Sequence, residues 1–267
     1  MDDDPVLVSR SGGVAHVVLN RPAARNALNL AMCHRLSEAF ARLDADGDVR
    51  AVLLRANGPA FCAGADLKER RGRDEPWVRS RRLASFRAYE SIERCAKPVV
   101  ALVHGPVVGS GGEIAMSCDF VVAAGDATFR FPEPHWGTVG ATQRLQRVIG
   151  KRRAKELLFT ARTMAVEEAV AVGLVARTVP AGELLAAGER LAETIAGAPA
   201  LAMSLTKQAV DLGSQTDLTS GIGIEMAAIE RCLADGGWRG GVDAFASGGG
   251  PGGGPDGRTG PENGAGR

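Results

Sequence analysis

Residues 97–133 read KPVVALVHGPVVGSGGEIAMSCDFVVAAGDATFRFPE, in which two apolar runs are joined through a glycine-rich hinge. The run before the hinge, PVVALVHG, predicts a buried strand, and FVVAA and ATFRF after it predict two more. Ser110 and Glu113 have the spacing of a capping box, which predicts a helix that starts at Ser110. Strands and a helix in this alternating order favour an α/β fold.

The same alternation extends towards the N-terminus. PVLVS and VAHVVLN flank Ser11-Gly12-Gly13 and predict a hairpin, and residues 30–46 carry apolar residues at helical spacing. VRAVLLRA then predicts a buried strand, and Asp66 and Glu69 form a second capping box, which predicts a helix start at Asp66. An arginine-rich helix is expected to follow, through about residue 96.

Beyond about Gly140 the chain is predicted to be helical throughout. We therefore expect a core over residues 1–195 and a C-terminal helical region over residues 196–246. Residues 247–267 are rich in glycine and proline and contain almost no apolar side chains, so they predict a disordered tail.

Composition excludes several classes of function. The chain has 267 residues with 32 basic and 31 acidic side chains, a net charge of +1, so it offers no strong overall field to nucleic acid or to an anionic membrane. Five cysteines without a C-x-x-C pair and four scattered histidines predict reduced thiols and no metal site. No apolar run is long enough to span a membrane, and MDDDPVLV lacks the features of a signal peptide, so a cytoplasmic location is expected.

Two glycine-containing segments precede predicted helix starts, residues 62–66 and residues 107–113. Each leaves unpaired N–H groups at the positive end of a helix, and two such donors aimed at one point would form an oxyanion hole. The alternative is an ordinary tight turn before a helix. A dinucleotide fingerprint fits poorly, because the third glycine of G-x-G-x-x-G falls on Ile114.

Four separated motifs resemble the enoyl-CoA hydratase/isomerase, or crotonase, family: NRPAARNALN, AFCAGADLKE, residues 97–133 and TQRLQRVIGKRRAKELLFTART. They occur in the order and spacing of that family, from about residue 6 to about residue 245. The resemblance implies a crotonase-like spiral of ββα units with a C-terminal α-helical trimerisation region, in a homotrimer or hexamer. It also implies an acyl-CoA thioester substrate, with coenzyme A as part of the substrate and no other cofactor.

By this resemblance the backbone N–H groups of Ala65 and Ser110 form the oxyanion hole for the thioester oxygen. Ser110 stands where the hydratases usually have glycine. Arg25 is expected near the CoA phosphates, and the adenine end of CoA is expected against the backbone of Ala63, Ala65, Asp66, Leu67 and Lys68.

Glu113 and Glu133 match both glutamates of the hydratases, so the resemblance assigns activation of water to Glu113 and protonation of the α-carbon to Glu133. Hydration of a 2-enoyl thioester needs such a base and such an acid, and nearby carboxyl groups can have pKa values shifted towards neutrality. The structural alternatives are a capping residue at Glu113 and a turn residue at Glu133. Enoyl-CoA hydratase activity is therefore predicted, with double-bond isomerisation or thioester hydrolysis as the alternative.

Three features depart from the family pattern. The segment PHWGTVGATQRL is a few residues shorter than usual after Glu133, His135 and Trp136 replace smaller residues, and the basic, aromatic C-terminus is missing. Residues 68–82 carry a local net charge of +4, from seven basic and three acidic side chains, so an RNA-binding relative is a further alternative. A single aromatic residue there, Trp77, supports base stacking poorly.

Overall fold

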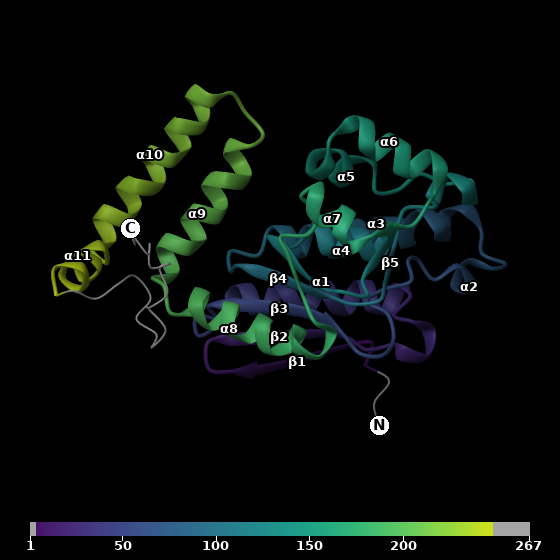
Figure 1. The fold of residues 1–267 in the computed structure, drawn as a ribbon, viewed down its shortest axis with the longest axis horizontal. Coiled ribbons are helices and arrows are strands. Elements are labelled where there is room, and N and C mark those ends of the chain that lie inside the picture. The colour runs from purple at the N-terminus through teal and green to yellow at the C-terminus, as the bar shows by residue number, and fades with distance from the viewer. Residues whose placement is uncertain (1–3, 248–267) are drawn as a thin grey trace, which may run out of the picture. The chain divides into compact units, whose positions relative to one another are not determined.

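The computed structural model describes residues 4–247, and the chain divides into two units between Ala196 and Gly197. The strands of the first unit form two sheets (Figure 1). Within the described residues the larger sheet has the order β1-β2-β3-β4-β6-β9 and the smaller has the order β5-β7-β8. Their bounds are Val6–Ser11 (β1), Val14–Leu19 (β2), Ala51–Ala56 (β3), Val99–Val103 (β4), Pro106–Val108 (β5), Phe120–Ala124 (β6), Thr128–Arg130 (β7), Met164–Ala165 (β8) and Arg177–Val179 (β9).

The predicted hairpin is confirmed, because β1 and β2 pair antiparallel with Val6 opposite Leu19. All later neighbours in the larger sheet are parallel. Parallel strands are buried on both faces, which explains the continuous apolar runs of the sequence. Along β3, for example, Val52 and Leu54 pack into one hydrophobic cluster and Leu53 into a second one.

The strand pairs β1–β2, β4–β5 and β6–β7 are each followed by helical segments, which gives a repeated strand–strand–helix unit, whereas β3, β8 and β9 each precede a helix singly. Its helices are α1 (Leu30–Ala45), α2 (Leu67–Arg70), α3 (Glu75–Glu93), α4 (Ser110–Met116), α5 (Thr142–Ile149), α6 (Lys151–Thr160), α7 (Val166–Ala171) and α8 (Leu184–Ala196), with short 3-10 helices η1 (Pro22–Ala24), η2 (Glu133–Trp136) and η3 (Ala181–Glu183). Helix α1 illustrates why these segments are helical. Asn29 caps it by accepting from the Met32 N–H at 2.9 Å, and its apolar face, with Leu36, Phe40 and Leu43, is buried.

The prediction of helices alone beyond Gly140 is wrong in part. Strand β8 pairs with β7, and β9 extends the larger sheet beside β6. Both strands have three residues or fewer, too few to show a period in the sequence. Helix α8 closes this face of the sheet, where Gly188 lies so near Leu102 that a Cβ would be 2.4 Å from its side chain.

The second unit contains α9 (Ala200–Gly213), α10 (Leu218–Asp235) and α11 (Trp238–Ala246), in agreement with the predicted helical region. Helices α9 and α10 pack against each other, with Gly213 next to Gly221. Leu218, Ile222 and Ile229 leave a largely exposed apolar row along α10. The predicted homotrimer or hexamer stays a prediction.

Two further expectations concern the chain ends and membranes. Residues 248–267 of the predicted tail lie outside the described residues. In the part of the chain from residue 4 to residue 247, no helix combines the length and apolar character needed to cross a membrane.

Candidate active site

The two glycine segments of the sequence lie side by side. The Cys62 N–H donates to the Pro106 carbonyl at 3.3 Å, and the Val108 N–H donates to the Cys62 carbonyl at 2.9 Å. Gly111 approaches this junction so closely that a Cβ there would lie 2.5 Å from the Cys62 carbonyl oxygen. Gly64 has a φ of +98°, and a Cβ there would lie 3.2 Å from the Val108 carbonyl oxygen. Only glycine permits this approach without displacing the backbone.

Two N–H groups in these segments are available to a ligand. The carbonyl of Gly64 and the N–H of Asp66 pair with Leu28 at 2.8 and 2.9 Å, which leaves the Ala65 N–H outside that ladder. Ser110 is the first residue of α4, where a helix has no acceptor for its N–H. Among residues 4–247, neither the Ala65 N–H nor the Ser110 N–H donates to a protein acceptor. The structure therefore brings both predicted donor segments together.

The capping box at Asp66 is confirmed in part. The Asp66 carboxylate accepts from the N–H groups of Lys68 and Glu69 at 3.1 and 3.4 Å. Glu69 does not return the contact, because its carboxylate accepts from the Leu30 N–H at 2.9 and 3.1 Å.

The capping box at Ser110 is wrong. Gly109, with a φ of +48°, is the N-cap residue, so Ser110 already lies inside the helix. The Ser110 side chain lies beside the Tyr89 hydroxyl, and the Glu113 carboxylate accepts from the Ala141 N–H, away from the helix start. The structural alternative for Glu113, a capping carboxylate, therefore does not hold.

Glu113 is buried and held by two strong donors. Its Oε1 accepts from the Ala141 N–H at 2.7 Å, and its Oε2 accepts from the Arg144 guanidinium at 2.9 Å. Arg144 also binds Glu93 through two N–H groups at 2.6 and 2.7 Å, and it lies over the Tyr89 ring at 5.3 Å from the centroid. Both Glu113 oxygens thus have fixed positions. Arg144, Glu93 and Tyr89 were not predicted from the sequence, although Arg144 belongs to the quoted TQRL motif.

The surroundings of the Glu133 carboxyl group differ from those of Glu113. It begins η2, and its carboxyl group lies against Gly109 and Gly140, where added Cβ atoms would come within 2.6 and 2.8 Å of its side chain. Its Oε2 is buried and has no hydrogen-bond partner among residues 4–247. Burial raises the pKa of Glu133 above its ordinary value, and the charge of Glu113 raises it further, while Arg82 opposes the shift. Glu133 is therefore more readily protonated than an ordinary glutamate.

Residues 137–141 connect the two carboxyl groups. Gly140 contacts the Glu133 side chain, and the next residue, Ala141, donates its N–H to Glu113. The segment that is short relative to the family pattern thus touches both acids. A protonated carboxyl group can deliver a proton, and a carboxylate can accept one. Two unpaired N–H groups beside them can polarise the carbonyl group of a bound compound.

The raised pKa of Glu133 predicts a pH-dependent stability. A raised pKa means that the folded protein binds this proton more tightly than the unfolded chain does, so the free energy of unfolding falls as pH rises from the ordinary glutamate pKa through the raised one. We expect Glu133→Gln to melt above the wild type at about pH 8, where the wild-type carboxyl group must ionise. This gain should vanish at about pH 4, where both side chains are neutral.

Melting curves across this pH range test the expectation. Glu90→Gln is the matched control, because Glu90 is an exposed helix residue paired with Arg94 at 2.9 Å. A wild type as stable as Glu133→Gln at about pH 8 would contradict the burial of an ionisable group at this position.

The residues expected to bind CoA lie along the first glycine segment. Arg25 is exposed and has a left-handed backbone (φ 49°), and its carbonyl accepts from the Ala63 N–H at 2.9 Å. Leu67 and Lys68 are exposed at the start of α2, whereas the Asp66 carboxylate pairs with Arg21 at 3.0 Å. Ala65 belongs to this row of residues, and its N–H is also one of the two donors of the candidate oxyanion hole.

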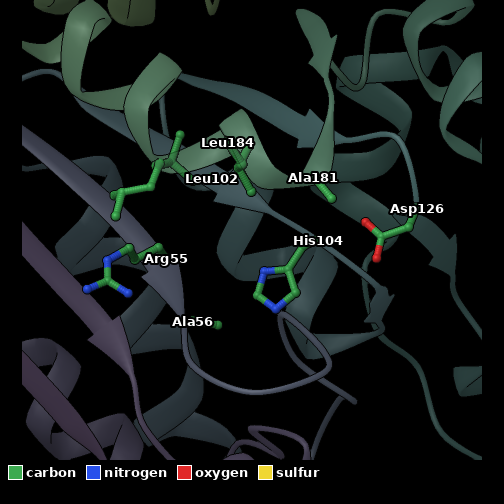
Figure 2. A pocket seen from close by; sticks show the side chains of 8 residues that line it. Arg55, Ala56, Leu102, His104, Asp126, Ala181 and Leu184 are labelled. Atoms are coloured by element: carbon green, nitrogen blue, oxygen red, sulfur yellow. The ribbon is translucent and has the colours of Figure 1, made fainter.

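A separate hollow of about 240 Å³ lies at the carboxyl ends of β3, β4 and β6 (Figure 2). Arg55, His104 and Asp126 supply its polar side chains, and none of the predicted site residues lines it. His104 is bound through Nε2 to the Gly58 carbonyl at 2.8 Å. Across the described residues, no three His, Cys, Asp or Glu side chains are grouped as a metal ion would require.

Repeated strand–strand–helix units, with two helix-starting glycine segments joined between them, make this a protein of the crotonase fold. The predicted fold class is confirmed. A crystal structure of an enoyl-CoA hydratase from Bacillus anthracis is similar with a TM-score of 0.89 and 34% identity, covering 92% of this chain and 98% of that one. An enoyl-CoA hydratase structure from Mycobacterium smegmatis gives a TM-score of 0.88 at 33% identity, over 92% and 98% of the two chains.

Proteins that are similar in sequence carry the same family name. The short-chain-enoyl-CoA hydratase of Clostridium acetobutylicum is 35% identical over 238 residues, which is 88% of this chain and 91% of that protein. An enoyl-CoA isomerase/hydratase of Mycosarcoma maydis is 35% identical over 245 residues, 87% and 89% of the two chains. The family model described as enoyl-CoA hydratase/isomerase matches residues 9–251. The chain belongs to the enoyl-CoA hydratase/isomerase family.

Proposed function

We propose that this protein is an enoyl-CoA hydratase that adds water across the double bond of a 2-enoyl-CoA thioester. The thioester oxygen accepts hydrogen bonds from the Ala65 and Ser110 N–H groups, which stabilise negative charge as it develops there. Glu113 orients the attacking water and accepts its proton. Glu133 delivers a proton to the α-carbon.

The observation that carries this proposal is the contrast between the two carboxyl groups. Glu113 is a buried acceptor held by Arg144 and the Ala141 N–H, whereas Glu133 has a buried oxygen without a partner and a raised pKa. Two carboxyl groups whose surroundings differ in this sense suit a base and an acid that act in one site. The names of the relatives in Bacillus anthracis and Clostridium acetobutylicum, both hydratases, agree with this choice.

The alternatives from the sequence receive less support. A thioester hydrolase that used Ser110 as nucleophile would need a base beside the hydroxyl, but the side chain beside it is the phenol of buried Tyr89, whose pKa is raised by burial. The basic stretch over residues 68–82 does not present one continuous cationic surface, because Arg81 is buried and Arg79 pairs with Glu75 at 2.7 Å. Isomerisation of the double bond is the second candidate, since the relative from Mycosarcoma maydis carries both activities in its name.

A spectroscopic assay separates these reactions. Hydration of 2-enoyl-CoA esters of several chain lengths consumes the conjugated-thioester absorbance, whereas isomerisation of 3-enoyl-CoA esters creates it. We expect loss of absorbance with 2-enoyl substrates and faster turnover there than with 3-enoyl substrates. Faster conversion of the 3-enoyl esters would assign the protein to the isomerases instead.

A further inference from the structure

No carboxylate among residues 4–247 lies within ion-pair distance of two arginines near the candidate active site. Arg70 ends α2 and Arg82 lies in α3, and an ion pair between their neighbours Glu69 and Arg81, at 3.4 Å, joins the two helices. Buried Arg81 also donates to Ser85 at 2.8 Å and to the Leu28 carbonyl, so its guanidinium group has several acceptors. Within residues 4–247, neither Arg70 nor Arg82 forms an ion pair.

Arg70 is the more unusual of the two. Its Nε is buried and has no acceptor among the described residues. Burial lowers the pKa of Arg70, and the nearby guanidinium groups of Arg81 and Arg82 lower it further, while Tyr89 and Glu69 oppose the shift. A partly buried cation without an acceptor is costly by itself, and an entering anion would supply both the missing charge and the missing hydrogen bond.

The position of Arg82 indicates which part of a substrate such an anion belongs to. Arg82 donates to the Thr138 hydroxyl at 2.8 Å, and the Thr138 N–H donates to the Glu133 carbonyl at 3.1 Å. In the proposed reaction Glu133 acts at the α-carbon. Arg82 therefore lies beside the acyl part of the site. The row expected to bind CoA, residues 63–68, precedes Arg70 along the chain.

We propose that Arg70 and Arg82 bind a carboxylate at the distal end of the acyl chain, so that the preferred substrates are enoyl-CoA esters of dicarboxylic acids. This inference deepens the proposed hydratase function and rests on it for the orientation of the substrate. Two guanidinium groups can hold a carboxylate through several charge-assisted hydrogen bonds, which a methyl group in the same place cannot accept.

Calorimetric titration with saturated acyl-CoA esters tests the inference without turnover. The ligands are matched pairs of four, five and six carbons, each pair consisting of a diacid mono-CoA ester and its methyl-ended counterpart, together with free CoA. For at least one pair, the wild type is expected to bind the diacid ester about 10- to 100-fold more tightly. Arg70→Met and Arg82→Met should each remove most of this preference and leave the affinity for free CoA unchanged.

Arg79→Met is the matched control, because Arg79 is an exposed residue of α3 that pairs with Glu75. Arg70→Gln and Arg82→Gln repeat the test if a methionine variant fails to fold. Equal affinity within all three pairs in the wild type would overturn the proposal. So would a loss of free CoA affinity in the arginine variants, which would assign them to the CoA phosphates. A diacid preference in a protein that hydrates no enoyl-CoA would instead reject the hydratase function alone.

Discussion

Glu113→Gln and Glu133→Gln are each expected to lower the turnover of crotonyl-CoA by about two to four orders of magnitude. Glutamine keeps the size of either side chain but neither accepts a proton from water nor delivers one to carbon. Because the candidate CoA-binding row contains neither residue, affinity for CoA should change little. The loss is expected in kcat, because both groups are proposed to act in the transition state.

Steady-state kinetics and titration with free CoA measure these two quantities separately. Glu90→Gln, on the exposed side of α3, should keep wild-type turnover and serves as the control. If Glu133→Gln hydrates crotonyl-CoA at the parent rate, the two-carboxylate mechanism is wrong for this protein. A loss confined to Glu113→Gln would point to a reaction that uses one base.

Ser110→Pro is expected to reduce turnover by about two to three orders of magnitude. Proline removes the N–H that the proposal aims at the thioester oxygen. Ser110 is the first residue of α4, a position at which helices accept proline readily, so the donor can be deleted with limited damage to the helix. Circular dichroism verifies that the variant folds.

Ser110→Gly separates the backbone from the hydroxyl. It retains the N–H, so turnover should stay near that of the wild type. A folded Ser110→Gly variant that binds CoA but is inactive would show that the hydroxyl takes part in the chemistry, and thioester hydrolysis would then become the better assignment.

Local patterns in the sequence predicted much of the fold. The hairpin, the buried strands and the helix start at Asp66 each depend on residues that are close in the chain, where apolar period and capping chemistry are visible. Ser110 shows the limit of that method. Its spacing to Glu113 fits a capping box, but Gly109 caps the helix and Glu113 is drawn towards Ala141 and Arg144, 28 and 31 residues further along.

The surroundings of the two acids could not be predicted in the same way. The contact of Arg144 with Glu93 spans 51 residues, and the contact of Glu133 with Gly109 depends on a left-handed glycine in another segment. Family resemblance identified Glu113 and Glu133 as a pair. Only the folded chain shows that one has two donors and the other has an oxygen with none.

The five residues at 137–141 bear on any attempt to redesign this protein. Gly140 lies against Glu133, and the next residue, Ala141, donates its N–H to Glu113. An insertion or a bulkier side chain there would therefore shift both carboxyl groups together. Libraries that randomise this loop to change acyl preference are therefore expected to yield mostly inactive variants. Helix α3 offers a more separable target, because Leu83 and Phe86 are exposed and hold neither carboxyl group.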